Sequence, residues 1–270
     1  MKTTRGTAHV VKRARQTPAL FRNFPGVFRA LALSDTRWAS KEITFRLRNG
    51  YTVVTPNADG ARFPLYEVFG DDGYRLGELT SGVDADATVL DVGGQIGSFS
   101  LAMAEAMPQV RIHVYEASPT SAGYVSRNIN ANGLQDRVTV NAKAMSGEVG
   151  EFTFVDSGDA SGHNGLTAPE GLGSEVTVPS ETFDNAVKAA GGNVQIVKMD
   201  VEGAEYDIVL RSDPASWAEV RKVVMEYHPV AGHTLDELVQ FFASVGLEPT
   251  RHDRGLREGL GLMWLARTAA

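Results

Sequence analysis

The segment "VKMDVEGAEYDIV" (residues 197–209) gathers groups that can hold or move protons. Lys198, Asp200, Glu202 and Glu205 follow one another within eight residues, at the end of a predicted buried strand. Side chains alternate along a strand with a period of two, so Lys198 and Asp200 share a face and can form an ion pair. Carboxylates also stabilise the first turn of a helix, which gives Glu202 and Glu205 a purely structural alternative.

A second charged segment, "RKVVMEYHP" (residues 221–229), places Glu226 and His228 on one face of another predicted strand. The ends of adjacent parallel strands meet at one edge of a sheet, so Asp200, Glu226 and His228 should lie within reach of one cleft. Histidine exchanges protons near neutral pH. Two carboxylates and a histidine also suit a divalent cation such as manganese or iron. The residue types therefore predict acid–base chemistry, with a metal site as the less favoured alternative.

A glycine-rich turn precedes this cluster in the chain. In "VLDVGGQIGSF" (residues 89–99), Gly93, Gly94 and Gly97 remove side chains between a predicted strand and a predicted helix, so a ligand can touch backbone amides. The turn alone is also compatible with a structural role. A dinucleotide fingerprint reads G-x-G-x-x-G and receives a pyrophosphate. Here the spacing differs, and Asp91 lies two residues before the first glycine, where its charge opposes a pyrophosphate and attracts a cation.

Glu116 supplies a partner for the turn. It lies 25 residues after Asp91, at the end of the next predicted strand, where a carboxylate accepts hydrogen bonds from ribose hydroxyls. Asp91 and Glu116 together favour a cationic nucleoside, and S-adenosylmethionine, with its sulfonium and ammonium groups, fits that description. A nicotinamide-dependent oxidoreductase on a similar sheet is the rival interpretation, and the glycine spacing opposes it.

With these segments in view, the sequence resembles the FkbM-type S-adenosylmethionine-dependent methyltransferases. The resemblance rests on "VLDVGGQIGSFS", "VYEASP", "IVKMDVEGAE" and "VVMEYH", in that order, and covers roughly residues 65–230. It implies a class I methyltransferase fold and transfer of a methyl group to a hydroxyl of a sugar or secondary metabolite. The chain departs from the family at Gly94-Gln95, where a small residue followed by Asn is common. Glutamine retains the amide, so we expect binding to persist.

The resemblance also extends the set of candidate site residues. Lys143 and Ala144 follow the third predicted strand, where the adenine ring is flanked, and Tyr74 in "EVFGDDGY" is expected to cover the methionine end. Glu202 and His163 are the candidate substrate contacts. The complete set expected to bind the cofactor is Asp91, Gly93, Gly94, Gly97, Glu116, Ala117, Lys143, Ala144, Asp200 and Tyr74.

Methyl transfer requires the acceptor oxygen, the methyl carbon and the sulfur in line, and an alcohol must lose its proton. His228 is the candidate general base, with Asp200 or Glu226 orienting it or the acceptor, and Lys198 completing the catalytic group. A divalent cation held by Asp200, Glu226 and His228 would lower the acceptor's pKa instead. A catalytically silent methyltransferase-like partner subunit is the third hypothesis.

The elements that must position these residues alternate between strands and helices from about residue 86, which predicts a doubly wound, mainly parallel sheet. An N-terminal extension precedes it, with helices at 8–16 and 25–33 interrupted near Pro18 and Pro25, and a hairpin at 43–54 turning on a type I′ Asn49-Gly50. Further predictions are strands at 88–92, 110–116, 137–144, 194–200 and 221–228, an antiparallel strand at 151–155, a terminal antiparallel pair at 247–253 and 260–267, helices at 98–106, 118–132, 182–190 and 233–245, and a loop at 156–175.

Composition limits the remaining possibilities. The chain of 270 residues has no cysteine, which excludes disulfides and thiolate sites and fits a cytoplasmic protein, and no apolar run long enough to span a membrane. Residues 1–34 carry seven basic and no acidic side chains, whereas the remainder is strongly acidic, which opposes nucleic-acid binding. We expect an N-terminal unit at 1–80 and a cofactor-binding domain at 81–270. The basic arm packs on the main domain or joins two copies of the chain.

Overall fold

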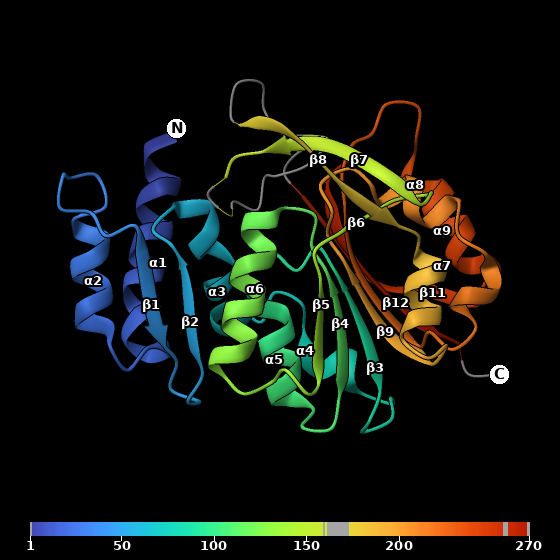
Figure 1. Ribbon diagram of the computed structural model, residues 1–270, viewed down its shortest axis with the longest axis horizontal. Helices are drawn as coiled ribbons and strands as arrows, with labels where there is room; N and C mark the ends of the chain where they lie inside the picture. The colour runs from blue at the N-terminus through green and yellow to red at the C-terminus, as the bar shows by residue number, and fades with distance from the viewer. Residues whose placement is uncertain (1, 159, 161–172, 256–258, 269–270) are drawn as a thin grey trace.

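A seven-stranded sheet forms the centre of the molecule (Figure 1). The computed structural model describes residues 2–158, 160, 173–255 and 259–268, with only the backbone for residues 2–9. The sheet has the order β11-β12-β10-β9-β3-β4-β5, in which five strands run parallel and β12 is antiparallel to both of its neighbours. Its strands are β3 (Thr88–Val92), β4 (Arg111–Tyr115), β5 (Val138–Asn141), β9 (Val194–Met199), β10 (Lys222–Tyr227), β11 (Leu247–Arg254) and β12 (Gly261–Arg267).

Strand order reverses between β3 and β9, because the chain first builds outward through β4 and β5 and then returns to the other side of β3. In sheets of this kind, ligands bind beyond the carboxyl ends of the strands at this reversal. The predicted doubly wound sheet with an antiparallel C-terminal strand is confirmed. Every residue of β3 is buried, as expected for a central parallel strand covered on both faces.

Helices cover both faces of the sheet (Figure 1). One side carries α5 (Ser98–Ala106) and α6 (Pro119–Ala131), and the other carries α7 (Phe183–Ala189), α8 (Glu205–Leu210), the short η1 (Pro214–Trp217) and α9 (Leu235–Ser244). Local sequence sets their starts. The Ser118 hydroxyl accepts the Ser121 amide and Pro119 begins α6, while Thr234 and Glu237 form a capping box at α9.

A separate three-stranded sheet crosses the top of the view in Figure 1. It consists of β6 (Ala144–Met145), β7 (Gly150–Asp156) and β8 (Ser174–Glu181), with β8 in the middle. The antiparallel strand predicted at 151–155 is therefore present, but it pairs with β8 and not with the main sheet. Much of the predicted loop at 156–175 lies outside the described residues.

The N-terminal elements extend from the left of Figure 1 to its centre, beside α5 and α6. They are α1 (Lys2–Leu20), α2 (Phe24–Ala32), β1 (Glu42–Arg46), β2 (Thr52–Pro56), α3 (Asp59–Asp71) and α4 (Leu76–Thr80). A single apolar cluster joins them to the main domain, since Phe21 and Phe45 belong to the same buried group as Leu65, Phe99 and Val89. Within the described residues, no helix has the length and apolar character needed to cross a membrane.

Two local predictions in this region are wrong. The helix predicted to end near Pro18 continues to Leu20, because a proline so close to the end removes only one hydrogen bond. The Arg48 guanidinium also donates to the Pro18 carbonyl, at 2.9 and 3.1 Å. The β1–β2 turn is not type I′, since Gly50 has a positive φ of 107° but Asn49 does not.

Candidate active site

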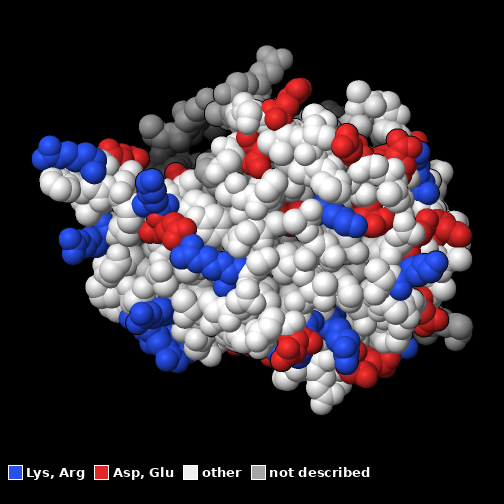
Figure 2. Space-filling view, in the orientation of Figure 1, with Lys and Arg blue, Asp and Glu red and all other residues white. Residues whose placement is uncertain are grey.

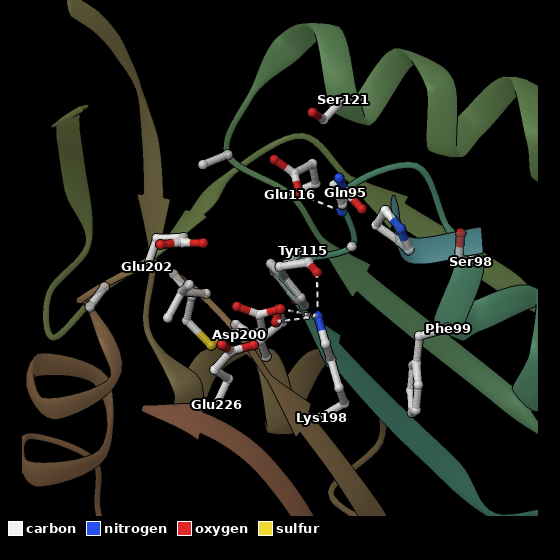
Figure 3. Close-up of a pocket in the computed structure, with 18 of the residues that line it drawn as sticks. Gln95, Ser98, Phe99, Tyr115, Glu116, Ser121, Lys198, Asp200, Glu202 and Glu226 are labelled. Atoms are coloured by element: carbon white, nitrogen blue, oxygen red, sulfur yellow. Dashed lines mark hydrogen bonds and ion pairs between the residues drawn. The ribbon is translucent and has the colours of Figure 1, made fainter. Parts of the chain in front are cut away.

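A cavity of about 320 Å³ opens at the carboxyl ends of β3, β4, β9 and β10, at the reversal of strand order (Figure 3). It is of the size expected for a small-molecule site. Helix α3 contributes one wall, and the turn after β3 contributes another. The segments that follow β4 and β9 bring most of the polar side chains.

The glycine turn needs its glycines for packing. Gly93 has a φ of +83°, and a Cβ there would overlap the Asp200 carbonyl oxygen. A Cβ on Gly94 would overlap the Val114 side chain. Gly93 and Gly94 line the cavity, whereas Gly97 starts α5 without lining it. The close packing against neighbouring strands is therefore what leaves backbone facing the cavity.

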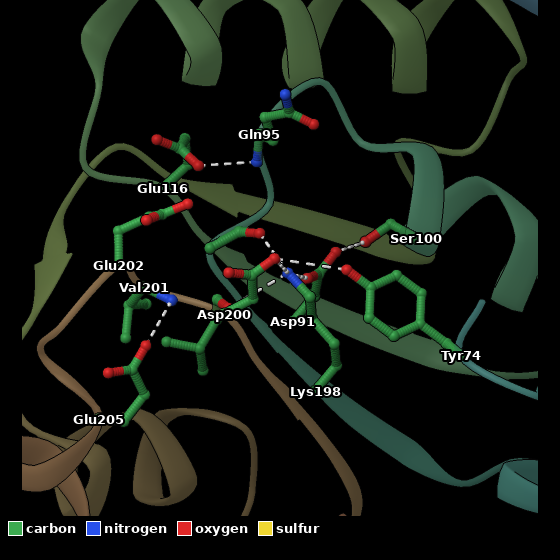
Figure 4. Close-up of polar contacts among 12 residues, drawn as sticks. Tyr74, Asp91, Gln95, Ser100, Glu116, Lys198, Asp200, Val201, Glu202 and Glu205 are labelled. Atoms are coloured by element: carbon green, nitrogen blue, oxygen red, sulfur yellow. Dashed lines mark hydrogen bonds and ion pairs between the residues drawn. The ribbon is translucent and has the colours of Figure 1, made fainter. Parts of the chain in front are cut away.

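Asp91 does not face the cavity, which corrects its expected contact with a cationic ligand. Its side chain is fully buried, and Oδ2 accepts a hydrogen bond of 2.6 Å from the Ser100 hydroxyl. The Lys198 ammonium lies 3.6 Å from Oδ1 and donates to the Gly93 carbonyl at 2.5 Å (Figure 4). Burial raises the pKa of Asp91, and the Lys198 charge partly offsets this. The Asp91–Lys198 pair thus holds the glycine turn in place through the Gly93 carbonyl.

Glu116, the predicted ribose acceptor, lies at the cavity. It follows β4, lines the cavity, and accepts the Gln95 amide at 2.7 Å and the Ser118 amide at 2.8 Å. Each carboxylate oxygen retains a further lone pair for a ligand hydroxyl. Burial raises the pKa of Glu116 to about 7 despite the two amide donors.

Three carboxylates meet at the other end of the cavity, those of Glu67, Asp200 and Glu226. Burial and the Asp200 charge raise the pKa of Glu67 to about 7 and that of Glu226 to about 8. The Tyr74 hydroxyl donates to Asp200 Oδ2 at 3.4 Å, and the Tyr74 ring packs on Phe99. The pocket is therefore acidic, and the pKa values of Glu67 and Glu226 lie near neutrality, the range in which general bases operate.

His228 lies behind this pocket and does not line it. Its Nδ1 is 2.8 Å from Glu205 Oε1, and its Nε2 is 3.3 Å from Glu202 Oε2. Burial alone would lower the pKa of His228, but the hydrogen bond and charge of Glu205 together with the Glu202 charge raise it to about 9. Both ring nitrogens of His228 thus face carboxylate oxygens, and the residue does not line the cavity. That His228 is the general base stays a prediction.

The set of residues that could bind a metal ion also differs from the predicted one. The predicted trio was Asp200, Glu226 and His228, whereas the ligand atoms that lie within 4.8 Å of one another belong to Asp200, Glu202 and His228. Each His228 nitrogen already faces a carboxylate oxygen. His228 thus forms ion pairs with Glu202 and Glu205 that support the loop between β9 and α8, in which Glu202 has a left-handed φ of 51°.

Most of the remaining residues that the sequence marked as site candidates line the cavity. The residues that line the cavity include Ala117, Lys143, Ala144, Lys198 and Glu202, and their contacts with a ligand stay predictions. His163 lies outside the described residues. Sequence reasoning missed Glu67 and Ser98, which also line the cavity. Ser98 follows the glycine turn directly and could have been found by that position, and Glu67 is the first residue of the segment "EVFGDDGY", from which only Tyr74 was selected.

The chain is similar to known proteins of one family. Residues 91–249 match the model of the "Methyltransferase FkbM domain". The 31-O-demethyl-FK506 methyltransferase FkbM of Streptomyces tacrolimicus is 29% identical, over 75% of this chain and 88% of that protein. Methyltransferase sdnD of Sordaria araneosa is 26% identical, over 62% of this chain and 74% of that protein.

One solved structure among the similar ones is the FkbM methyltransferase of Methylobacillus flagellatus KT. It has a TM-score of 0.48 and 13% sequence identity, and the match covers 69% of this chain. This chain spans only 45% of that protein's solved chain.

Proposed function

Because the chain belongs to the FkbM methyltransferase family, we propose that it transfers a methyl group from S-adenosylmethionine to a hydroxyl of a sugar or secondary metabolite. The observation that carries the proposal is one cavity, at the reversal of strand order, that joins Glu116 to a pocket of carboxylates. A relative whose name specifies an O-demethyl substrate supports oxygen as the acceptor atom.

The residues present fit this methyl donor. Glu116 offers acceptor lone pairs for ribose hydroxyls, and Ala117, Lys143 and Ala144 line the cavity nearby, where the adenine ring is proposed to bind. The acidic pocket around Asp200 suits a cation, whereas it opposes a pyrophosphate and hence a dinucleotide. When bound, S-adenosylmethionine supplies an electrophilic methyl group on a sulfonium.

Glu226 is the general base of the proposed reaction, because it lines the cavity and its pKa of about 8 lets it hold a proton taken from an alcohol. Asp200, held by the Tyr74 hydroxyl and near Lys198, orients the acceptor. His228 is a positioning residue, since it ties Glu202 and Glu205 together behind the cavity. Lys198 holds the Gly93 carbonyl and Asp91.

The test is transfer of a labelled methyl group from S-adenosylmethionine to a panel of hydroxylated sugars and metabolites, with and without a chelator. We expect label in an ether product, with no loss on chelation. Loss of activity with the chelator would replace the Glu226 base with a metal-assisted reaction. Thermal stabilisation by NAD alone would contradict the methyl donor itself.

The silent-subunit hypothesis makes a different prediction. Such a protein would be stabilised by S-adenosylmethionine and S-adenosylhomocysteine but would methylate nothing on the panel. A reaction product that appears with the wild type and is lost in Glu226→Gln separates an enzyme from such a subunit.

A further inference from the structure

Helix α2 exposes apolar side chains on the side that faces away from the molecule. Val27, on its inner side, is fully buried in the apolar cluster of the N-terminal elements. The exposed positions include Pro25, Phe28, Arg29 and Ala32. Their spacing of i, i+3, i+4 and i+7 places them in one stripe along the helix, and three of the four are apolar. A helix on a protein surface normally has a polar outer face, so this stripe fits a partner that accepts apolar groups.

Trp38 extends the apolar stripe beyond the end of α2. Helix α2 and the turn that follows it, residues 33–41, form the outer left end of the molecule in Figure 1. Trp38 is 67% exposed, and the Arg37 guanidinium lies 4.6 Å from the centre of a Trp38 ring. Tryptophan is favoured where an apolar phase meets water, because its ring is apolar and its N–H is polar. We call the exposed stripe of α2, together with Arg37 and Trp38, the α2 surface.

Positive charge surrounds the α2 surface. Residues 1–41 contain nine basic residues and one acidic residue, Asp35. The side chains of Arg22, Arg29 and Arg37 are exposed, and they form no ion pair with any side chain that the structure describes. Lysine and arginine side chains are also frequent at this end of the molecule in Figure 2. The rest of the chain is acidic, so a negatively charged surface would attract the α2 end and repel the other end.

Two other partners fit the α2 surface less well than a lipid bilayer. A symmetric dimer brings the same surface of two subunits together, so a dimer formed through α2 would oppose Arg29 to the same positive charge of the second copy. A nucleic acid would pair its phosphates with the arginines but would leave Phe28 facing charged groups. An anionic bilayer satisfies both parts of the surface, because its phosphates attract arginine and its acyl boundary accepts apolar side chains.

We propose that the α2 surface binds reversibly to an anionic lipid bilayer. Phe28 and Trp38 enter the boundary between headgroups and acyl chains, and the arginines on and beside the surface pair with lipid phosphates. The described residues that line the cavity do not include any of these. The proposal therefore concerns a second site, and it does not depend on the proposed methyl transfer.

Co-sedimentation of the full chain with vesicles tests the proposal. The protein should bind vesicles of equal parts phosphatidylcholine and phosphatidylglycerol, but not vesicles of phosphatidylcholine alone, and about 0.5 M salt should weaken the binding. Arg29→Glu changes the charge by two units and should lower the partition coefficient about 30-fold. Phe28→Ser should lower it about fivefold, because less apolar area is removed from water.

Matched control variants change the same kinds of side chain far from α2 in the sequence. Lys188→Glu reverses an exposed charge on α7, and Val149→Ser removes an apolar side chain that is 61% exposed. Both controls should bind the anionic vesicles as the wild type does. An equal loss of binding in a control and in the matching α2 variant would overturn the proposal.

Tryptophan fluorescence gives a second readout, which a general loss of folding would not reproduce. Trp217 and Trp264 are buried, whereas Trp38 is exposed. Brominated phosphatidylcholine in the anionic vesicles should therefore quench the emission of Trp38, and Trp38→Phe should abolish this quenching.

Three results would contradict membrane binding. These are equal binding to neutral and anionic vesicles, no binding to either, and quenching that persists in Trp38→Phe. Binding to polyglutamate or to a single-stranded oligonucleotide, without binding to vesicles, would also overturn the proposal, because it would assign the α2 surface to an acidic protein or a nucleic acid.

Discussion

Glu226 of β10 and His228, which follows that strand, both have pKa values above those of the free side chains. Burial and the nearby Asp200 charge favour the neutral form of Glu226, with a pKa of about 8. Burial also disfavours charge on His228, but contact with Glu205 and Glu202 overcomes it and holds the pKa at about 9. The neutral carboxyl is thus favoured at Glu226, which lines the cavity, and the charged imidazolium is favoured at His228 behind it.

The Glu226 assignment predicts the pH dependence of turnover. Activity should rise as pH increases towards 8 or above, because only the ionised carboxylate accepts the acceptor's proton. A bound cationic donor lowers the pKa of a nearby carboxyl, so the rise in kcat should occur at lower pH than the rise in kcat/KM for the donor.

Glu226→Gln should lower kcat by about 10²- to 10⁴-fold and abolish the rising limb. Rates measured from pH 5.5 to 9.5 with the acceptor found in the panel check this prediction, with donor affinity of the variant as the control. If the activity of Glu226→Gln still rose with pH as that of the wild type does, another residue would be the base.

The His228 network predicts a pH-dependent stability. The pKa of His228 in the folded protein, about 9, exceeds its ordinary value of 6.5, so the stabilisation is fully present below about pH 6.5 and is lost as the pH rises through 9. His228→Gln should lower the free energy of unfolding by roughly 2 kcal/mol at pH 6.5, and the difference from the wild type should shrink by pH 10.

Urea unfolding at both pH values measures this difference. The comparison between the two proteins cancels the titration of other groups. A difference that stays constant between pH 6.5 and 10 would mean that His228 is not charged in the folded protein.

At the scale of elements, one side chain joins three segments around the cavity. Pro64 lies inside α3 and has no amide hydrogen, so the Gly60 carbonyl loses its helical partner. The Gln95 side-chain amide donates to that carbonyl at 3.1 Å and to the Ala160 carbonyl at 3.2 Å. The Gln95 backbone amide donates to Glu116. The departure at Gly94-Gln95 thus has a structural reason in this chain: its amide holds α3 against the glycine turn.

Gln95→Glu tests this link with almost no change of shape. At pH 7 the variant would place a carboxylate against two carbonyl oxygens, so we expect the free energy of unfolding to fall by roughly 2 kcal/mol. The deficit should become smaller towards pH 4, where the carboxyl gains a proton and can donate again. Chemical unfolding at the two pH values measures it, and an equal deficit at both would contradict the hydrogen-bond explanation.

Elements with a strong local pattern could be predicted from the sequence. The buried run of β3, the Ser118-Pro119 start of α6 and the terminal antiparallel pair all follow from local chemistry. Helix α3 was missed because Gly60, Pro64 and Gly70 weaken its helical signal. Its stability comes from packing on α1 and α5.

The site could be predicted in part for a similar reason. Glu116 and Asp200 lie at strand ends, which the sheet topology fixes, and both line the cavity. The roles of Asp91 and His228 could not be predicted, because they depend on partners that face them only in the folded protein. Lys198 neutralises Asp91, and Glu205 meets His228 from the first turn of α8. Period-two alternation predicts on which face of a strand a side chain lies. It does not predict which side chain of another element pairs with it there.

For the molecule as a whole, basic side chains of residues 1–34 are paired with an acidic side chain of α3. Lysine and arginine side chains gather at the left of Figure 2, over the N-terminal elements, and acidic side chains are frequent towards the right. Asp71 at the end of α3 pairs with Lys12 at 2.8 Å and with Arg13 at 2.9 Å, and accepts a hydrogen bond from Gln16. Part of the positive charge of residues 1–34 is thus paired with an acidic side chain of the same chain.

The packing beneath these ion pairs predicts that the N-terminal unit and the methyltransferase domain unfold together. Phe21 and Phe45 are fully buried with ring centroids 4.8 Å apart, and Phe21 also meets Tyr66 of α3 at 5.5 Å. These rings belong to the same apolar cluster as the helices that cover the sheet. Phe45→Ala should therefore lower the free energy of unfolding by about 3–5 kcal/mol and shift one cooperative transition. Circular dichroism and tryptophan fluorescence, followed during the same unfolding experiment, should coincide in both proteins. An early separate transition in the variant would show that residues 1–80 fold as an independent domain.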